Sequence, residues 1–195
     1  MMKKYMGVAF LALAVFLTAC GGAEEKIDPN MSEEVNDFTF TTQDREELSL
    51  EDLKGEYWIA DFIFTNCTSV CLPMTSNLAK LQQKTADEEM DLQFVSFSVD
   101  PEYDTPEVLK EYAKEYQANL DNWTFVTGYD FETIKEFSIK SFKSMVAPPP
   151  EGNDQVTHGT SFFLINPEGK VIKKYNGVLA DSIDTIFADL KKLGL

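Results

Sequence analysis

"EYWIADFIFTNCTSVCLPM", residues 56–74, contains two of the three cysteines of this 195-residue chain. Its first ten residues are rich in aromatic and β-branched side chains and lack glycine and proline, which predicts a buried strand. After the cysteines, Met74, Leu78 and Leu81 recur at helical spacing, which predicts a helix. The two cysteines therefore lie where a strand turns into a helix. Three uses of the pair stay open here: a structural disulfide, a redox couple and a pair of metal ligands.

Strand and helix patterns alternate through the rest of the chain. Strands are predicted at 92–100, 122–128 and in a hairpin over 161–177. Helices are predicted at 104–116, 130–142 and 181–194, and a Pro/Gly-rich loop is predicted at 146–157. This order predicts an α/β domain of three layers with a mixed central sheet, whose antiparallel part is the hairpin turning at Asn166–Gly169. Ligand sites in such sheets gather at the carboxyl ends of the strands, where Cys67 and Cys71 fall.

The N-terminal residues have the features of a secretory signal. Two lysines precede an apolar run over 6–17, which is shorter than the about 20 residues that a membrane-spanning helix needs. The sequence Leu-Thr-Ala-Cys at 17–20 resembles the lipobox of bacterial lipoproteins, which implies cleavage before Cys20 and a diacylglyceryl group on its sulfur. The alternative is an ordinary secretory signal with an incidental cysteine. We predict a lipoprotein signal peptide over 1–19 and lipidation of Cys20, which would anchor the protein at the extracytoplasmic face of the cell membrane.

Residues 20–37 are polar, acidic and poor in large apolar side chains, which predicts a flexible, lipid-anchored tether. Residues 38–195 have the usual length of one domain. The net charge is −16, and loss of the signal peptide with its two lysines makes it −18. A chain this acidic is not expected to bind nucleic acid or anionic lipid headgroups. Once Cys20 carries lipid, Cys67 and Cys71 remain as thiols in a compartment where disulfides persist.

The two cysteines are four residues apart, so their sulfurs can converge on one point. Cys71 is expected in the first turn of the helix and Cys67 in the loop before it, where unpaired N–H groups favour thiolates. A buried disulfide or a pair of inert thiols is the alternative, although a bridge across so short a loop restricts the unfolded chain little. His158, the only histidine, directly precedes the "TSFFLI" strand and follows the Pro/Gly-rich loop. A lone histidine is more often a surface or core residue than a ligand.

Three stretches together resemble the Sco (synthesis of cytochrome oxidase, SenC) family: "DFIFTNCTSVCLPMT" at 61–75, "SFSVDPEYDTPEVLKEYA" at 96–113 and "VTHGTSFFLINPEGKVIKKYNG" at 156–177. The resemblance runs from about Phe38 to the last helix. It implies a thioredoxin-like fold in which Cys67, Cys71 and His158 bind one copper ion per chain, as Cu(I) or Cu(II). It also implies that the protein delivers copper to, or keeps reduced the cysteines of, the dinuclear copper centre of cytochrome c oxidase subunit II. Many members have proline directly after the second cysteine, where this chain has Leu72.

The donor set agrees with this resemblance. Two thiolates and an imidazole suit Cu(I) and also Zn(II). A structural zinc site takes four ligands, and no convincing fourth is found, because the helical spacing of Met74 predicts a core position. Asp100 and Asp104 are expected to build a turn and a helix start. Asp100 is also a candidate for orienting a ligand from outside the metal's own shell.

Two other functions fit the same compartment. A thiol–disulfide oxidoreductase has the same fold, and the Cys67–Cys71 pair would then be its redox-active disulfide. Thioredoxins have two residues between their cysteines rather than three, and a cis-proline where this chain has Thr160, so a general oxidoreductase is disfavoured. A copper or redox sensor that acts through a partner also stays open. We predict a metallochaperone with a possible reductase activity, served by other copper chaperones or thiol oxidoreductases, and no catalytic residues beyond the cysteine pair.

Overall fold

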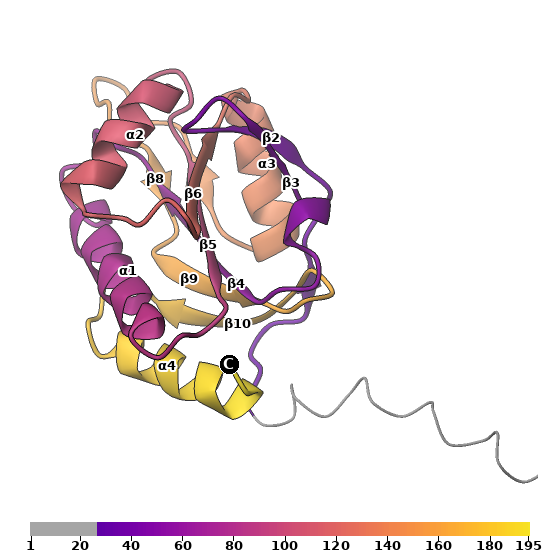
Figure 1. The fold of residues 1–195 in the computed structure, drawn as a ribbon. Coiled ribbons are helices and arrows are strands. Elements are labelled where there is room, and N and C mark those ends of the chain that lie inside the picture. The colour runs from indigo at the N-terminus through magenta and orange to yellow at the C-terminus, as the bar shows by residue number, and fades with distance from the viewer. Residues whose placement is uncertain (1–26) are drawn as a thin grey trace, which may run out of the picture.

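The computed structural model describes residues 27–195, so the predicted signal peptide over 1–19 and the predicted lipid site at Cys20 lie outside the described residues. A mixed sheet of eight strands forms the centre of the fold, in the order β1-β10-β9-β4-β5-β6-β2-β3 (Figure 1). These strands are β1 Glu33–Glu34, β2 Thr39–Thr42, β3 Glu47–Ser49, β4 Trp58–Ile63, β5 Gln93–Ser98, β6 Trp123–Thr127, β9 Ser161–Ile165 and β10 Lys170–Asn176. A separate pair of strands consists of β7 Val146–Ala147 and β8 Thr157–His158.

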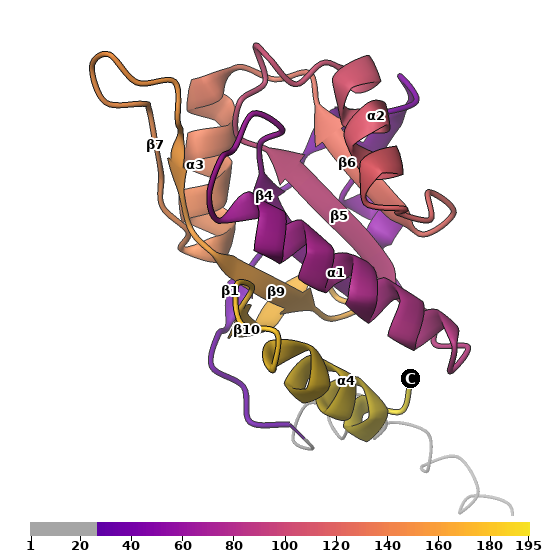
Figure 2. The same cartoon turned by 90° about the vertical axis from the view of Figure 1, so that its left-hand side faces the viewer.

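Helices cover both faces of the sheet, as predicted for a three-layer α/β domain (Figures 1 and 2). They are α1 Cys71–Ala86, α2 Pro106–Glu115, α3 Phe131–Phe142 and α4 Ser182–Leu193, with a short 3-10 turn at Glu51–Leu53. One apolar cluster joins α1, α2 and α4 to the sheet through side chains such as Leu78, Leu109 and Ile186. A second cluster lies under α3 and includes Ile134 and Phe142. The sheet is therefore buried on both sides.

Strand β4 is the element that carries the chain to the cysteines. All six of its residues are buried, and it pairs in parallel with β5 and antiparallel with β9. Its buried position on both faces matches the apolar sequence, because a central strand covered on both sides needs no polar alternation. The strand ends at Ile63 and α1 begins at Cys71, so the loop over 64–70 lies at the carboxyl end of the central strands.

The predicted hairpin is present as β9 and β10, which pair antiparallel. Its turn closes where expected, with the Gly169 N–H donating to the Asn166 carbonyl at 2.9 Å. Gly169 has φ of +84°, a backbone conformation that glycine adopts without steric cost. The strands β2 and β3, which were not predicted, form a second hairpin at the other edge of the sheet. They are too short and too polar to produce a clear period of two.

Part of the predicted tether belongs to the domain, which corrects the boundary expected between residues 37 and 38. Ile27 and Val35 are buried, and β1 pairs antiparallel with β10. The Asn30 side chain also donates to the Lys174 carbonyl at 3.1 Å and accepts from the Lys174 N–H at 2.8 Å. Composition alone missed this segment because its few apolar residues are separated by polar ones, and because β10 offers a free edge to which a polar strand can bind.

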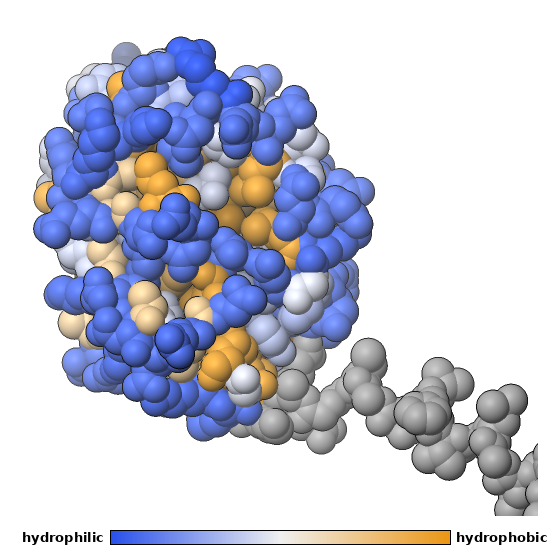
Figure 3. All heavy atoms as spheres, viewed as in Figure 1, coloured by the Kyte–Doolittle hydropathy of each residue, from blue (hydrophilic) through white to orange (hydrophobic). Residues whose placement is uncertain are grey.

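The surface agrees with the acidic composition. Figure 3 shows one face, which is covered mostly by hydrophilic side chains with smaller hydrophobic patches between them. Among residues 27–195 there is no helix with the length and apolar character needed to cross a membrane.

Candidate metal centre

The loop between β4 and α1 presents both cysteines to one place. Cys71 is the first residue of α1 and is fully buried, while Cys67 lies in the preceding loop and is 6% exposed. No side chain caps the N-terminus of α1, and its first turn holds no acidic residue. The unpaired N–H groups and the helix dipole therefore favour negative charge on a sulfur at this end of the helix.

His158 reaches the cysteines from the other side, on the short strand β8. This strand is held by β7, with His158 paired to Val146. The imidazole Nδ1 lies 2.9 Å from the Gly159 carbonyl oxygen, and Nε2 lies 3.1 Å from Cys71 Sγ. A carbonyl oxygen only accepts, so Nδ1 carries the proton and Nε2 is left with its lone pair toward the sulfurs. Neutral imidazole with a free Nε2 is the form that binds a metal.

The three predicted ligands come together. One ligand atom from each of Cys67, Cys71 and His158 lies within 4.8 Å of the other two, and all three residues are buried. Both cysteines are free thiols, so the structure is in the dithiol state. Two soft sulfurs and one imidazole nitrogen form a donor set suited to Cu(I).

The two thiols are not equivalent in acidity. A hydrogen bond from Cys71 holds the pKa of Cys67 well below its usual range, against the effect of burial and with further help from the backbone N–H groups of Ser69 and Cys71. The same hydrogen bond, together with burial, raises the pKa of Cys71. The pair therefore ionises easily at Cys67 and keeps its remaining proton on Cys71. A site with one thiolate at neutral pH can bind a soft cation or attack a disulfide.

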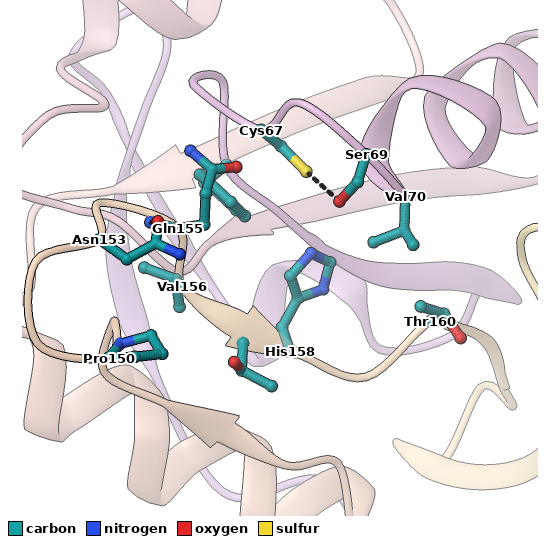
Figure 4. A pocket seen from close by; sticks show the side chains of 11 residues that line it. Cys67, Ser69, Val70, Pro150, Asn153, Gln155, Val156, His158 and Thr160 are labelled. Atoms are coloured by element: carbon teal, nitrogen blue, oxygen red, sulfur yellow. Dashed lines mark hydrogen bonds between the residues drawn. The ribbon is translucent and has the colours of Figure 1, made fainter.

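A cavity of about 340 Å³ opens over Cys67 and His158. Figure 4 shows the Cys67 sulfur above the imidazole, 3.9 Å from Ser69 Oγ, with the segment over 150–157 on the opposite wall. The ring of Phe64 meets the imidazole edge-on, with 5.7 Å between ring centroids. The site is thus enclosed by protein and still open to a small ion or to an approaching thiol.

A carboxylate of the acidic turn, Asp104, supports the loop that carries Cys67. Asp104 is fully buried and accepts from the Thr65 N–H at 3.2 Å, from Thr65 Oγ1 at 2.5 Å and from Ser98 Oγ at 2.6 Å. It thereby ties the start of the cysteine loop to β5 and α2. Asp100 mainly builds the turn, since its carbonyl accepts from the N–H groups of Tyr103 and Asp104. Its role in orienting a ligand stays a prediction, and the position of Asp104 directly before the helix-capping Thr105 was the signal that could have pointed to the other carboxylate.

Leu72 stands where many Sco proteins have proline, and this difference does not disturb the start of α1. Leu72 is 47% exposed, and Pro73 lies in the first turn of α1, where its missing N–H has no helical partner to lose. Met74 is fully buried in the apolar cluster under α1. The core position predicted for Met74 is confirmed.

A family model described as SCO1/SenC matches residues 27–194. This chain belongs to the SCO1/SenC family. The match begins at Ile27, which is buried in the apolar cluster under α1 and α4. The predicted resemblance is therefore confirmed over nearly the whole described chain.

Several SCO1/SenC proteins are similar along most of their length. The SCO1 protein homolog of Bacillus subtilis is 50% identical over 190 residues, covering 97% of each chain. A SCO1/SenC family lipoprotein from Bacillus anthracis superposes with a TM-score of 0.81 at 46% identity, covering 86% of this chain and 98% of that one. BsSco, a member of the Sco family of cytochrome c oxidase assembly proteins with an identified disulfide switch, has a TM-score of 0.77 at 51% identity, covering 86% and 96%. ScoI of Arabidopsis thaliana with copper bound has a TM-score of 0.69 at 26% identity, covering 80% and 98%.

These matches also establish the fold. Sco structures have a thioredoxin-like fold, and the mixed sheet with helices on both faces is that fold, as predicted. The family comprises copper-binding proteins of cytochrome c oxidase assembly.

Proposed function

We propose that this protein holds one copper ion with Cys67, Cys71 and His158 and serves the assembly of cytochrome c oxidase. Its target is the dinuclear copper centre of subunit II, to which it delivers copper or whose cysteines it keeps reduced. Lipid on Cys20 anchors it at the extracytoplasmic face of the membrane. Similarity to a lipoprotein of Bacillus anthracis supports this location, and similarity to copper-bound ScoI supports the metal.

The observation that carries the proposal is the convergence of two sulfurs and one imidazole nitrogen within 4.8 Å. Cys71 at the start of α1 and His158 on β8 are held by regular backbone, and Nδ1–H bonded to the Gly159 carbonyl leaves Nε2 free. The bound copper supplies the cargo for the oxidase, or a redox-active ion beside the thiols. The chain supplies two soft ligands and an imidazole at the base of a cavity that is open to an approaching ion or partner.

A second candidate is a thiol–disulfide reductase that acts on the oxidase cysteines. The observation that favours it is the lowered pKa of Cys67, caused by the hydrogen bond from Cys71 and opposed by burial. The Cys67 thiolate would attack a disulfide of the partner, and Cys71 would then displace the partner's thiolate to close an intramolecular disulfide. Two electrons pass from this chain to the partner, so a further thiol reductant must return it to the dithiol.

Anaerobic titration of the reduced soluble domain with copper distinguishes the copper-holding function from the thiol–disulfide reductase. The expected result for the copper-holding function is one equivalent per chain, with a thiolate-to-Cu(II) charge-transfer band when the metal is Cu(II). Absence of copper binding, together with rapid reduction of insulin disulfides, would instead establish the oxidoreductase.

A further inference from the structure

One side chain, Gln155, binds the loop on both sides of Cys67. Of the three ligand residues, Cys71 belongs to a helix and His158 to a strand, whereas Cys67 lies in an irregular loop. Regular elements hold their residues through backbone hydrogen bonds, and an irregular loop depends on side chains for the same purpose. The Cys67 N–H has only a long bond of 3.4 Å to the Phe64 carbonyl.

The amide of Gln155 binds the two peptide groups that flank Cys67. Its Nε2 donates to the Asn66 carbonyl at 3.0 Å, which belongs to the peptide bond before Cys67. Its Oε1 accepts from the Thr68 N–H at 3.1 Å, which belongs to the peptide bond after Cys67, and from Thr68 Oγ1 at 3.3 Å. Both torsions of Cys67 are thus fixed from outside the loop by a single planar group.

The same residue links the loop to the segment that carries His158. Gln155 is three residues before His158 and projects from this segment toward the Cys67 loop (Figure 4). The amide is itself oriented, since Nε2 also donates to Asp154 Oδ1 at 3.0 Å. A neighbouring bond from Asn66 Nδ2 to Asp154 Oδ2 at 3.1 Å lies between the same two segments. The distance between the Cys67 loop and β8 is therefore set by these side chains.

We infer that Gln155 is a positioning residue that holds Cys67 in the place where its sulfur faces Cys71 and His158 as a separate thiol. A disulfide needs the two sulfurs at about 2.05 Å. In this inference the gap closes by movement of the Cys67 loop, because Cys71 is held in the first turn of α1. The Gln155 hydrogen bonds belong to the dithiol arrangement and are strained or lost by that movement. Gln155 therefore favours the dithiol over the disulfide. It also favours the arrangement in which Cys67, Cys71 and His158 hold the metal together over one in which the Cys67 loop has moved away. The metal part of this inference rests on the proposed function, whereas the dithiol part does not.

The test compares Gln155→Met, which keeps the length of the side chain and removes both hydrogen-bonding atoms, with Gln155→Glu, which keeps the acceptor for Thr68. Gln83→Met is the matched control, because Gln83 is an exposed glutamine on α1 whose amide bonds only to Asp87 in the described hydrogen bonds. Copper affinity is measured by competition with a chelator under anaerobic conditions. The dithiol–disulfide equilibrium is measured in mixtures of reduced and oxidised dithiothreitol without metal. There one S–S bond forms between Cys67 and Cys71 while that of the dithiothreitol ring breaks, and two electrons and two protons pass to dithiothreitol.

For Gln155→Met we expect copper binding to weaken about tenfold or more, as is usual when a residue that orients a ligand is lost. We expect its dithiol–disulfide equilibrium to shift about tenfold toward the disulfide, which corresponds to about 30 mV. Gln155→Glu should lie between Gln155→Met and the wild type, and Gln83→Met should match the wild type in both measurements. The melting temperature of the reduced Gln155→Met protein should fall by no more than about 4 °C, the effect of about 1 kcal/mol in a domain of this size.

The inference is overturned if Gln155→Met matches the wild type in its dithiol–disulfide equilibrium, or if Gln83→Met shows the same shift. A fall in melting temperature large enough to account for both changes would also overturn it, because Gln155 would then act on the whole fold. If the wild type bound no copper, the proposed function would fail, while the dithiothreitol equilibrium would still decide the role of Gln155.

Discussion

The three ligand side chains of the candidate metal centre are held in three different ways. Cys71 is held by the first turn of α1, Cys67 by hydrogen bonds to its flanking peptides, and His158 by the Gly159 carbonyl that fixes its tautomer. Each of these contacts positions one donor atom, so removal of one ligand side chain should leave the other two in place. This makes the ligands separable by mutation.

His158→Ala should abolish tight copper binding and leave the fold intact. The residue is buried but lies on a strand of two residues at the rim of the domain, so little core packing is lost. Loss of a ligand should cost more than the about 10–100-fold that follows loss of a residue outside the metal's own shell. Affinity is measured by anaerobic competition, with Thr157→Ala on the same strand as the control. If His158→Ala bound copper with wild-type affinity, His158 would not be a ligand and would have only a structural role.

Asp61 should make the stability of the reduced, metal-free domain depend on pH. It is fully buried on β4, where burial raises the pKa of its carboxyl to about 7 against the hydrogen bond from Ser96. The unfolded value is about 3.9, so between about pH 4 and 7 the folded state binds the extra proton and the free energy of unfolding falls as pH rises. The slope due to this one group reaches about 1.4 kcal/mol per pH unit. Urea unfolding of Asp61→Asn across this range should give a flatter profile than the wild type, and an identical slope would refute the assignment.

At the scale of elements, α4 is joined to β10 by a buried charge. Asp189 on α4 is 2% exposed, and its carboxylate accepts from Lys173 Nζ at 2.8 Å, Lys192 Nζ at 3.0 Å and the Tyr175 hydroxyl at 3.0 Å. Lys173 and Tyr175 both belong to β10. This cluster is therefore the polar part of the contact between the last helix and the sheet.

Asp189→Ala should lower the free energy of unfolding by about 3 kcal/mol, because it leaves Lys173 largely buried without its counterion. The control is Asp184→Ala on the same helix, whose ion pair with Lys84 is 81% exposed at the carboxylate. An exposed pair of this kind contributes about 0–1 kcal/mol. Both values come from urea denaturation at neutral pH. Equal effects of the two substitutions would show that the cluster does not hold α4 to the sheet.

The elements that sequence patterns predicted are those with enough residues to show a period. β4, β5, α2 and α3 were placed within a few residues, because each buries a continuous run or a helical stripe. β1, β7 and β8 have two residues each, and their pairing depends on a neighbouring edge rather than on their own sequence. The same reason explains why part of the predicted tether is ordered.

The candidate site was predictable in its ligands but not in its supports. The Cys67–Cys71 spacing and the strand–turn–helix pattern indicated convergence at the end of β4, and the family resemblance added His158. Gln155 gave no comparable signal, because a single polar residue in a loop belongs to no repeating pattern, and for Asp104 the sequence offered only its place before the helix-capping Thr105. Their roles depend on which peptide groups the fold brings beside them.

At the scale of the whole molecule, copper should stabilise the reduced protein and not the oxidised one. Only the folded dithiol offers two thiolates with His158, so copper at a thousandfold excess over Kd should add about 4 kcal/mol to the free energy of unfolding. For a domain of this size that is a rise in melting temperature of about 8–16 °C. Calorimetry of reduced and oxidised protein, each with and without copper, measures it. A comparable rise in the oxidised sample would mean that the metal does not need the thiolates.

The docking of residues 27–37 onto the domain also determines how high above a membrane the cysteines would work. In Figures 1 and 2 the described chain begins beside α4, at the end of the domain away from the loop between β4 and α1. With lipid on Cys20, as proposed, six residues (21–26) lie between the anchor and Ile27, the first described residue, and six residues span at most about 20 Å. A compact domain of this length is about 40 Å across. Because the linker is short and the metal site lies at the end of the domain opposite the anchor, the metal would face away from the membrane, about 40–60 Å from the bilayer. At that distance it could meet a projecting domain of a partner rather than the lipid surface.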